Sequence, residues 1–138
     1  MALPQDSFVE LPPAPGGGYP VTVSRETDGT CVVAGPRQPR ALAPQVRLWS
    51  TAAACSREPA VRGVLVVDAM FGTPALHEVQ TLVDDVISRH WGHAKLAWVV
   101  LEPSPERRAS VAEVWTRLRG IDGRAFLSEA AAREWLAG

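Results

Sequence analysis

The side chains best able to do chemistry in this sequence flank one short turn. Asp68 closes an apolar run at residues 64–67, and Thr73 follows shortly after Gly72. A carboxylate at a strand end can act as a general base or bind a cation, but a catalytic base needs an activated nucleophile or a second carboxylate within reach. The sequence places neither beside Asp68, so we expect its oxygens to accept hydrogen bonds from turn amides. We find no catalytic residue set and do not expect an enzyme.

Thr73 has a structural and a regulatory interpretation. Its place before Pro74 is typical of a helix N-cap, because proline is favoured as the first helical residue, and such a cap stabilises a helix by about 1 kcal/mol. A phosphate on the same hydroxyl would be favoured by the helix dipole and opposed by the charge of Asp68. The sequence leaves both roles open, with Thr73 as a candidate phospho-acceptor.

The histidines and cysteines do not indicate a metal site. His77 and His90 lie too far apart on one predicted helix to bind a single ion, and His90 and His93 lack a third ligand nearby. Cys31 and Cys55 lack the C-x-x-C spacing, so we expect two reduced, partly buried thiols in a reducing compartment. No metal and no cofactor are expected.

The elements that must position these side chains alternate between strands and helices. The run at residues 64–67 has no polar interruption, which is typical of a strand buried on both faces of a helix-covered sheet. The order ββαβαβαβα predicts an α/β fold with a mixed, mostly parallel sheet of four to five strands and about four helices. The expected strands are residues 20–26, 30–34, 61–68, 95–101 and 124–127, and the expected helices are residues 43–57, 74–90, 106–119 and 129–137.

Length and composition set further limits. Residues 1–18 are rich in proline and glycine and predict a flexible N-terminal arm, which leaves one domain at residues 19–138. A net charge of −1 offers no overall basic field for nucleic acid. No apolar run approaches the roughly 20 residues that span a bilayer, and no secretory signal is recognised, so we expect a cytoplasmic protein.

Several local sequences resemble SpoIIAA-like STAS domains, a group within the bacterial STAS/SEC14-like proteins. They are GVLVVDAM at the central strand, the helix LHEVQTLVDDVISRHWG, the strand AKLAWVVLEP and the ending GRAFLSEAAAREWLAG. The resemblance implies a regulatory, partner-binding module without known catalysis, with helices mostly on one side of the sheet. In the anti-sigma-factor antagonists of this family, a Ser or Thr at the helix start after the central strand is phosphorylated. Here Asp68 and Thr73 take the corresponding places, in a turn that reads D-A-M-F-G-T-P rather than D-S-S-G.

We therefore expect a non-enzymatic STAS-like domain that binds a regulatory protein partner through the loop and helix start after the central strand. Exposed Met and aromatic side chains suit adaptable binding surfaces, and the residues expected at this one are Asp68, Met70, Phe71, Thr73, Leu76 and His77. The alternative is a carrier of a small apolar molecule or lipid, with a pocket between sheet and helices lined by Phe71, Trp98 and Trp115. The sequence also leaves open a homodimer.

Overall fold

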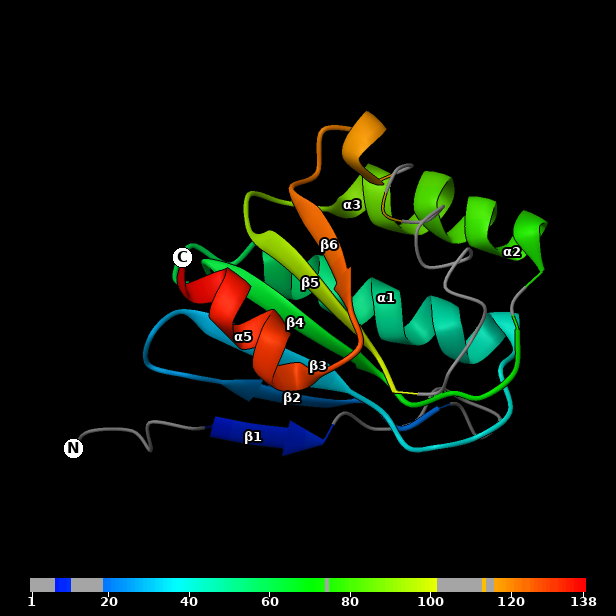
Figure 1. Ribbon diagram of the computed structural model, residues 1–138, viewed down its shortest axis with the longest axis horizontal. Coiled ribbons are helices and arrows are strands. Elements are labelled where there is room, and N and C mark those ends of the chain that lie inside the picture. Colours follow the sequence, from blue (N-terminus) through cyan, green and yellow to red (C-terminus); the bar gives the residue numbers. More distant parts are fainter. Residues whose placement is uncertain (1–6, 11–18, 74, 102–112, 114–115) are drawn as a thin grey trace.

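The fold is built on one sheet of six strands. The computed structural model describes residues 7–10, 19–73, 75–101, 113 and 116–138. The strands lie side by side in the order in which they occur along the chain (Figure 1): β1 (Ser7–Glu10), β2 (Thr22–Arg25), β3 (Thr30–Ala34), β4 (Gly63–Asp68), β5 (Lys95–Val100) and β6 (Gly123–Phe126). The first three strands pair antiparallel, and β3 to β6 pair parallel. The predicted α/β class and mixed sheet are confirmed, with one strand more than expected.

The additional strand, β1, comes from the segment expected to be a flexible arm. It pairs with β2 in an antiparallel register that runs from Ser7 opposite Arg25 to Glu10 opposite Thr22. Residues 1–6 and 11–18 lie outside the described residues. This part of the predicted arm is therefore an edge strand of the sheet.

The hairpin between β2 and β3 forms where the sequence Thr27-Asp28-Gly29 predicts it. Gly29 has a φ of 92°, a left-handed conformation that costs glycine little. The Asp28 Oδ1 atom accepts a hydrogen bond from the Thr30 amide at 2.9 Å, and the Glu26 amide donates to the Thr30 carbonyl at 2.8 Å. The hairpin returns the chain as β3, which lies directly beside β4.

Helices cover both faces of the sheet. One face carries α1 (Leu42–Ser56) and the continuous helix formed by α2 (Leu76–Thr81), the π-helical turn η1 (Leu82–Ile87) and α3 (Ser88–His90), whereas α5 (Glu129–Ala137) lies on the other face (Figure 1). Residues 113 and 116–118 are helical and belong to the predicted helix at 106–119, of which residue 119 lies in a turn and residues 106–112, 114 and 115 are not described. The predicted helices at 43–57 and 129–137 are confirmed, and the one at 74–90 begins later than expected.

The central strand β4 lies in the interior of the sheet, and five of its six residues are buried. Val64 and Val66 face the larger core beneath α1 and the 76–90 helix, while Leu65 faces α5. Because β3 to β6 run parallel, their carboxyl ends meet at one edge, which is where open α/β sheets place their binding sites. The turn after β4 emerges at this edge.

Candidate interaction site at the carboxyl end of the sheet

A buried arginine holds the turn that follows β4. Arg40 precedes α1, and its side chain is only 5% exposed. Its guanidinium donates three hydrogen bonds of 2.8 Å, from Nη1 to the Asp68 carboxylate, from Nη2 to the Met70 carbonyl and from Nε to the Gly72 carbonyl. The Arg40 amide also donates to the Phe71 carbonyl at 2.8 Å. Arg40 therefore fixes the course of the whole turn.

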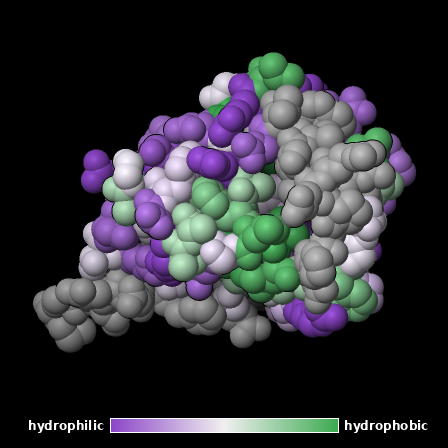
Figure 2. Space-filling model, viewed as in Figure 1, coloured by the Kyte–Doolittle hydropathy of each residue, from purple (hydrophilic) through white to green (hydrophobic). Residues whose placement is uncertain are grey.

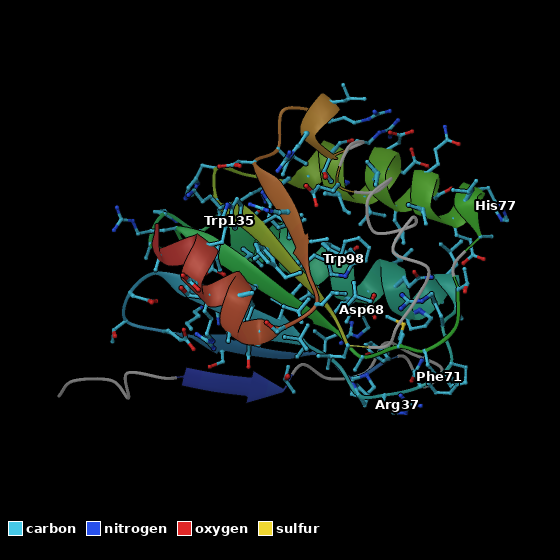
Figure 3. The ribbon with its side chains drawn as sticks, viewed as in Figure 1. Arg37, Asp68, Phe71, His77, Trp98 and Trp135 are labelled. Atoms are coloured by element: carbon cyan, nitrogen blue, oxygen red, sulfur yellow. The ribbon has the colours of Figure 1, made fainter. Side chains whose placement is uncertain are left out.

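Asp68 is a structural carboxylate. Its side chain has no exposed surface, its Oδ2 atom accepts from Arg40, and its Oδ1 atom accepts from the Met70 amide at 3.0 Å. The expectation that Asp68 binds turn amides is confirmed. The expectation that Asp68 lies on the binding surface is wrong. Both carboxylate oxygens are engaged in hydrogen bonds and have no solvent contact, so Asp68 lies beneath that surface. Figure 3 shows Asp68 inside the molecule and Phe71 at its margin.

Met70 is a core residue, and its predicted exposure is wrong. The side chain is 0% exposed and packs with the larger core cluster. The cause is the hydrogen bonding of the main chain, because the Met70 amide is held by Asp68 and the Met70 carbonyl by Arg40. These bonds fix the turn with the thioether directed inward.

Thr73 is not the N-cap of the helix, so this prediction is also wrong. The helix begins at Leu76, and its N-cap residue Ala75 makes no side-chain hydrogen bond. The Phe71 amide donates to the Gln38 carbonyl at 3.0 Å, which ties the turn to the loop before α1 and delays the helix start. Thr73 is left exposed, and its role as a phospho-acceptor stays a prediction.

Gln45 joins the buried cluster to the helix starts. This residue of α1 is buried, and its Oε1 atom accepts from Arg40 Nη1 at 3.4 Å. Its Nε2 atom donates to the Ala41 carbonyl at 3.0 Å and to the Glu78 carboxylate at 3.4 Å. The last bond links the first turn of α1 to the first turn of α2.

Tyr19 completes the cluster. Its hydroxyl donates to the Pro36 carbonyl at 2.6 Å, and its ring is buried. Burial, followed by the negative charge of Asp68, raises the pKa of Tyr19 to about 12, while the positive charge of Arg40 acts in the opposite direction. The phenol is therefore held in its neutral, hydrogen-bond-donating form.

Besides Thr73, three more of the expected surface residues face solvent. Leu76 is 49% exposed, His77 is exposed, and Phe71 is half-buried with the Arg37 guanidinium 4.6 Å from its ring centroid. Figure 3 shows Arg37, Phe71 and His77 at the same end of the molecule. Phe71, Thr73, Leu76 and His77 therefore form the outer surface of the segment that Arg40 holds from inside.

The exposed leucines gather at this edge of the sheet. Among the described residues, five large hydrophobic side chains are exposed, and four of them belong to segments at the carboxyl ends of the parallel strands. Leu42 and Leu76 begin α1 and α2, and Leu101 and Leu127 directly follow β5 and β6. The fifth, Leu118, lies shortly before β6 and thus at the opposite edge. Figure 2 shows hydrophobic side chains gathered on the α5 face near the ends of β5 and β6.

The residues of the alternative carrier pocket are only partly described. Trp98 meets Trp49 edge to face, with ring centroids 5.4 Å apart, and so fills space between the sheet and α1. The indole nitrogen of Trp98 is buried and makes no hydrogen bond to any described group. Trp115 lies outside the described residues, so the carrier stays a prediction.

The candidate ligands of the sequence do not converge. Cys31 and Cys55 are buried and unbridged, and a hydrogen bond to Cys55, followed by burial, raises the pKa of Cys31. His93 Nε2 lies 2.8 Å from the Val61 carbonyl, whereas His77 stands on α2 in solvent. Across the described ranges, no three His, Cys, Asp or Glu side chains come together to hold a metal ion.

Arg40 is the residue of this site that the sequence analysis did not identify. A buried carboxylate is stable only when it is paired, so an Asp at the end of a buried strand implies a cation nearby. Because β3 and β4 are parallel neighbours, the loop after β3 reaches the same edge, and Arg37 and Arg40 both lie in that loop. The sequence offers no means of choosing between these two arginines.

No protein-family model, curated protein or solved structure matches this chain. Among the described residues, none of the helices combines the length and the apolar character needed to cross a membrane.

Proposed function

We propose that this chain is a non-enzymatic regulatory domain of the STAS-like type, which binds a protein partner through the carboxyl end of its sheet. One observation carries the proposal: four of the five exposed leucines of the described residues stand at that edge. Exposed apolar patches on folded proteins are typical of interaction sites. The regulatory role rests on the resemblance to the anti-sigma-factor antagonists.

The arrangement favours binding over catalysis. The buried carboxylate at the edge is neutralised by Arg40 and has both oxygens engaged, so it is a poor general base. The same bonds preorganise the turn, which lowers the entropy cost of association because the loop does not need to be ordered by its partner. We infer that Phe71, Leu76 and Leu42 supply apolar contacts, with Thr73 and His77 at the margin.

The test compares the same substitution, leucine to serine, at the two edges of the sheet. Leu76→Ser removes apolar surface at the proposed face, and Leu118→Ser removes a leucine at the opposite edge that is more exposed, at 72% compared with 49% for Leu76. Each variant and the wild type are used as bait in extract of the native cell, and captured proteins are quantified by mass spectrometry. The proposal requires a protein that wild type and Leu118→Ser retain and Leu76→Ser loses.

Two results would overturn the proposed surface. Equal capture by all three baits would place any binding elsewhere. A loss caused by Leu118→Ser alone would move the interface to the amino edge of the sheet. Sedimentation of the purified chain shows separately whether the partner at this face is a second copy.

A further inference from the structure

We propose a second site, at the opposite edge of the sheet, that binds the phosphate group of a small molecule. A hollow of about 460 Å³ lies where β3, β4 and β5 begin, and its lining includes Asp28, Thr30, Arg62, Lys95, Arg133 and Leu136. Its volume falls in the range of small-molecule sites. The site is independent of the proposed partner surface, which lies at the carboxyl edge.

The lining combines cations from three separate elements. Arg62 directly precedes β4, Lys95 begins β5, and Arg133 lies on α5. The main chain sets them side by side, because the Lys95 amide donates to the Arg62 carbonyl at 3.0 Å. Figure 1 shows the C-terminal end of α5 beside the starts of β4 and β5. Three cationic side chains thus approach one hollow from different directions.

Packing positions each of these cations. A Cβ atom added at Gly29 would lie 2.7 Å from Arg62 Cγ, so the stem of Arg62 rests on Gly29. The Lys95 ammonium lies 5.1 Å from the ring centroid of Trp135, which Figure 3 labels on α5. Arg133 is held by two hydrogen bonds to the Glu26 carboxylate, at 2.7 and 2.9 Å.

Two of the three charges have no acidic partner. In the part of the chain that the structure describes, neither Arg62 nor Lys95 forms an ion pair with a carboxylate, whereas Arg133 pairs with Glu26 and Glu129. Cations placed together repel one another unless an anion lies between them. Guanidinium and ammonium groups are the side chains that usually bind phosphate in proteins. Because a phosphate group is doubly charged, it can neutralise several cations at once, which a single carboxylate cannot do.

Asp28 is the acidic side chain of the lining, and its charge can be removed by substitution. The Asp28 carboxylate accepts from the Thr30 amide, and the hydrogen bonds from Thr30 lower the pKa of Asp28. Asp28 therefore stays charged at neutral pH and opposes an anion in the hollow. Removing this charge by Asp28→Asn is expected to tighten phosphate binding, while Arg62→Met is expected to weaken it.

Binding can be followed by the acetylation of Lys95, because it is the only lysine in the chain. Acetylation by an N-hydroxysuccinimide ester is followed on the Lys95 peptide by mass spectrometry, in inorganic phosphate and in chloride of equal ionic strength. At a phosphate concentration about ten times the dissociation constant, occupancy of the site predicts about tenfold slower acetylation. Glycerol phosphate and vesicles of anionic phospholipid form further arms, which separate soluble phosphates from a lipid headgroup.

The matched control is Arg89→Met, which removes an exposed arginine of α3 outside the lining. The inference requires protection by phosphate and glycerol phosphate in wild type and in Arg89→Met, and its loss in Arg62→Met. It is overturned if chloride protects Lys95 equally well, if Arg62→Met keeps full protection, or if only the vesicles protect.

Discussion

Arg40 is the residue on which the geometry of the carboxyl edge depends. It bonds to one carboxylate and to three carbonyls of the turn, counting the bond from its own amide, while its side chain is almost fully buried. Such a pair need not add net stability when compared with well-packed apolar residues, but breaking it leaves a buried charge without compensation. The Arg40–Asp68 pair therefore sets the shape of the turn more than it sets the stability of the fold.

Arg40→Met is expected to destabilise the protein strongly. The substitution leaves the Asp68 carboxylate buried and unpaired, which typically costs about 3–5 kcal/mol. Denaturant unfolding measures the loss, with Arg89→Met as the exposed control, for which about 0.5 kcal/mol or less is expected. Adding Asp68→Asn to Arg40→Met recovers part of the loss, because the buried charge is then absent. Equal losses of unfolding free energy in Arg40→Met and Arg89→Met would show that the Arg40–Asp68 pair does not hold the turn.

Tyr19 reports on the same cluster, because it is the only tyrosine in the chain. Its pKa is about 12 in the folded state, compared with about 10 for an unperturbed tyrosine. The folded state thus binds the phenolic proton more tightly than the unfolded state does. Stability is unaffected by this group below the unfolded pKa and decreases as the pH rises from there toward the folded value.

Tyrosinate absorbance after rapid pH jumps measures this titration before the protein unfolds. We expect a midpoint near 12 in wild type and a lower midpoint in Asp68→Asn, because the charge of Asp68 contributes to the rise. A native midpoint at the value of free tyrosine, or one that Asp68→Asn leaves unchanged, would show that the phenol and the carboxylate do not interact.

At the residue scale, the sequence could predict that Asp68 accepts from turn amides but not that it pairs with Arg40. A carboxylate after a buried strand must be satisfied by the adjacent turn, and the Met70 amide does this. The arginine comes from a loop 28 residues earlier, so only the three-dimensional arrangement identifies it. The burial of Met70 depends on the same bonds and was unpredictable for the same reason.

The elements themselves were largely predictable, and their ends were not. The apolar run of β4, the Asp-Gly hairpin and the helical spacing of residues 76–90 all reflect local patterns. The start of α2 depends instead on a tertiary contact, the bridge between Phe71 and Pro39. The strand β1 was missed because its pairing with β2 is also non-local.

Two hydroxyl residues near helix starts give a matched test of the observed boundaries. Ser128 caps α5, with its hydroxyl oxygen accepting from the Ala131 amide at 3.1 Å, whereas Thr73 caps nothing. We expect Ser128→Ala to lower the unfolding free energy by about 1 kcal/mol, and Thr73→Ala to change it by less than about 0.5 kcal/mol. Thermal or urea unfolding measures both. A cost of Thr73→Ala as large as that of Ser128→Ala would restore Thr73 as the cap.

On the scale of the whole molecule, the two edges of the parallel sheet differ in chemistry. The carboxyl edge carries exposed leucines over a turn fixed by Arg40, and the amino edge carries cations around a hollow. The central sheet separates them, so that a partner at one edge leaves the other accessible. Substitutions at Leu76 and at Arg62 are therefore expected to act independently on partner binding and on phosphate protection.

The central claim is that the carboxyl edge binds a protein partner. The most direct measurement is the dissociation constant of the captured partner, purified and titrated against wild type, the double variant Leu42→Ser/Leu76→Ser and the single variant Leu118→Ser. Because burying a leucine contributes about 1.5–3 kcal/mol, the double variant is expected to weaken binding at least about tenfold while Leu118→Ser leaves it unchanged. Equal dissociation constants for the three proteins would contradict the claim.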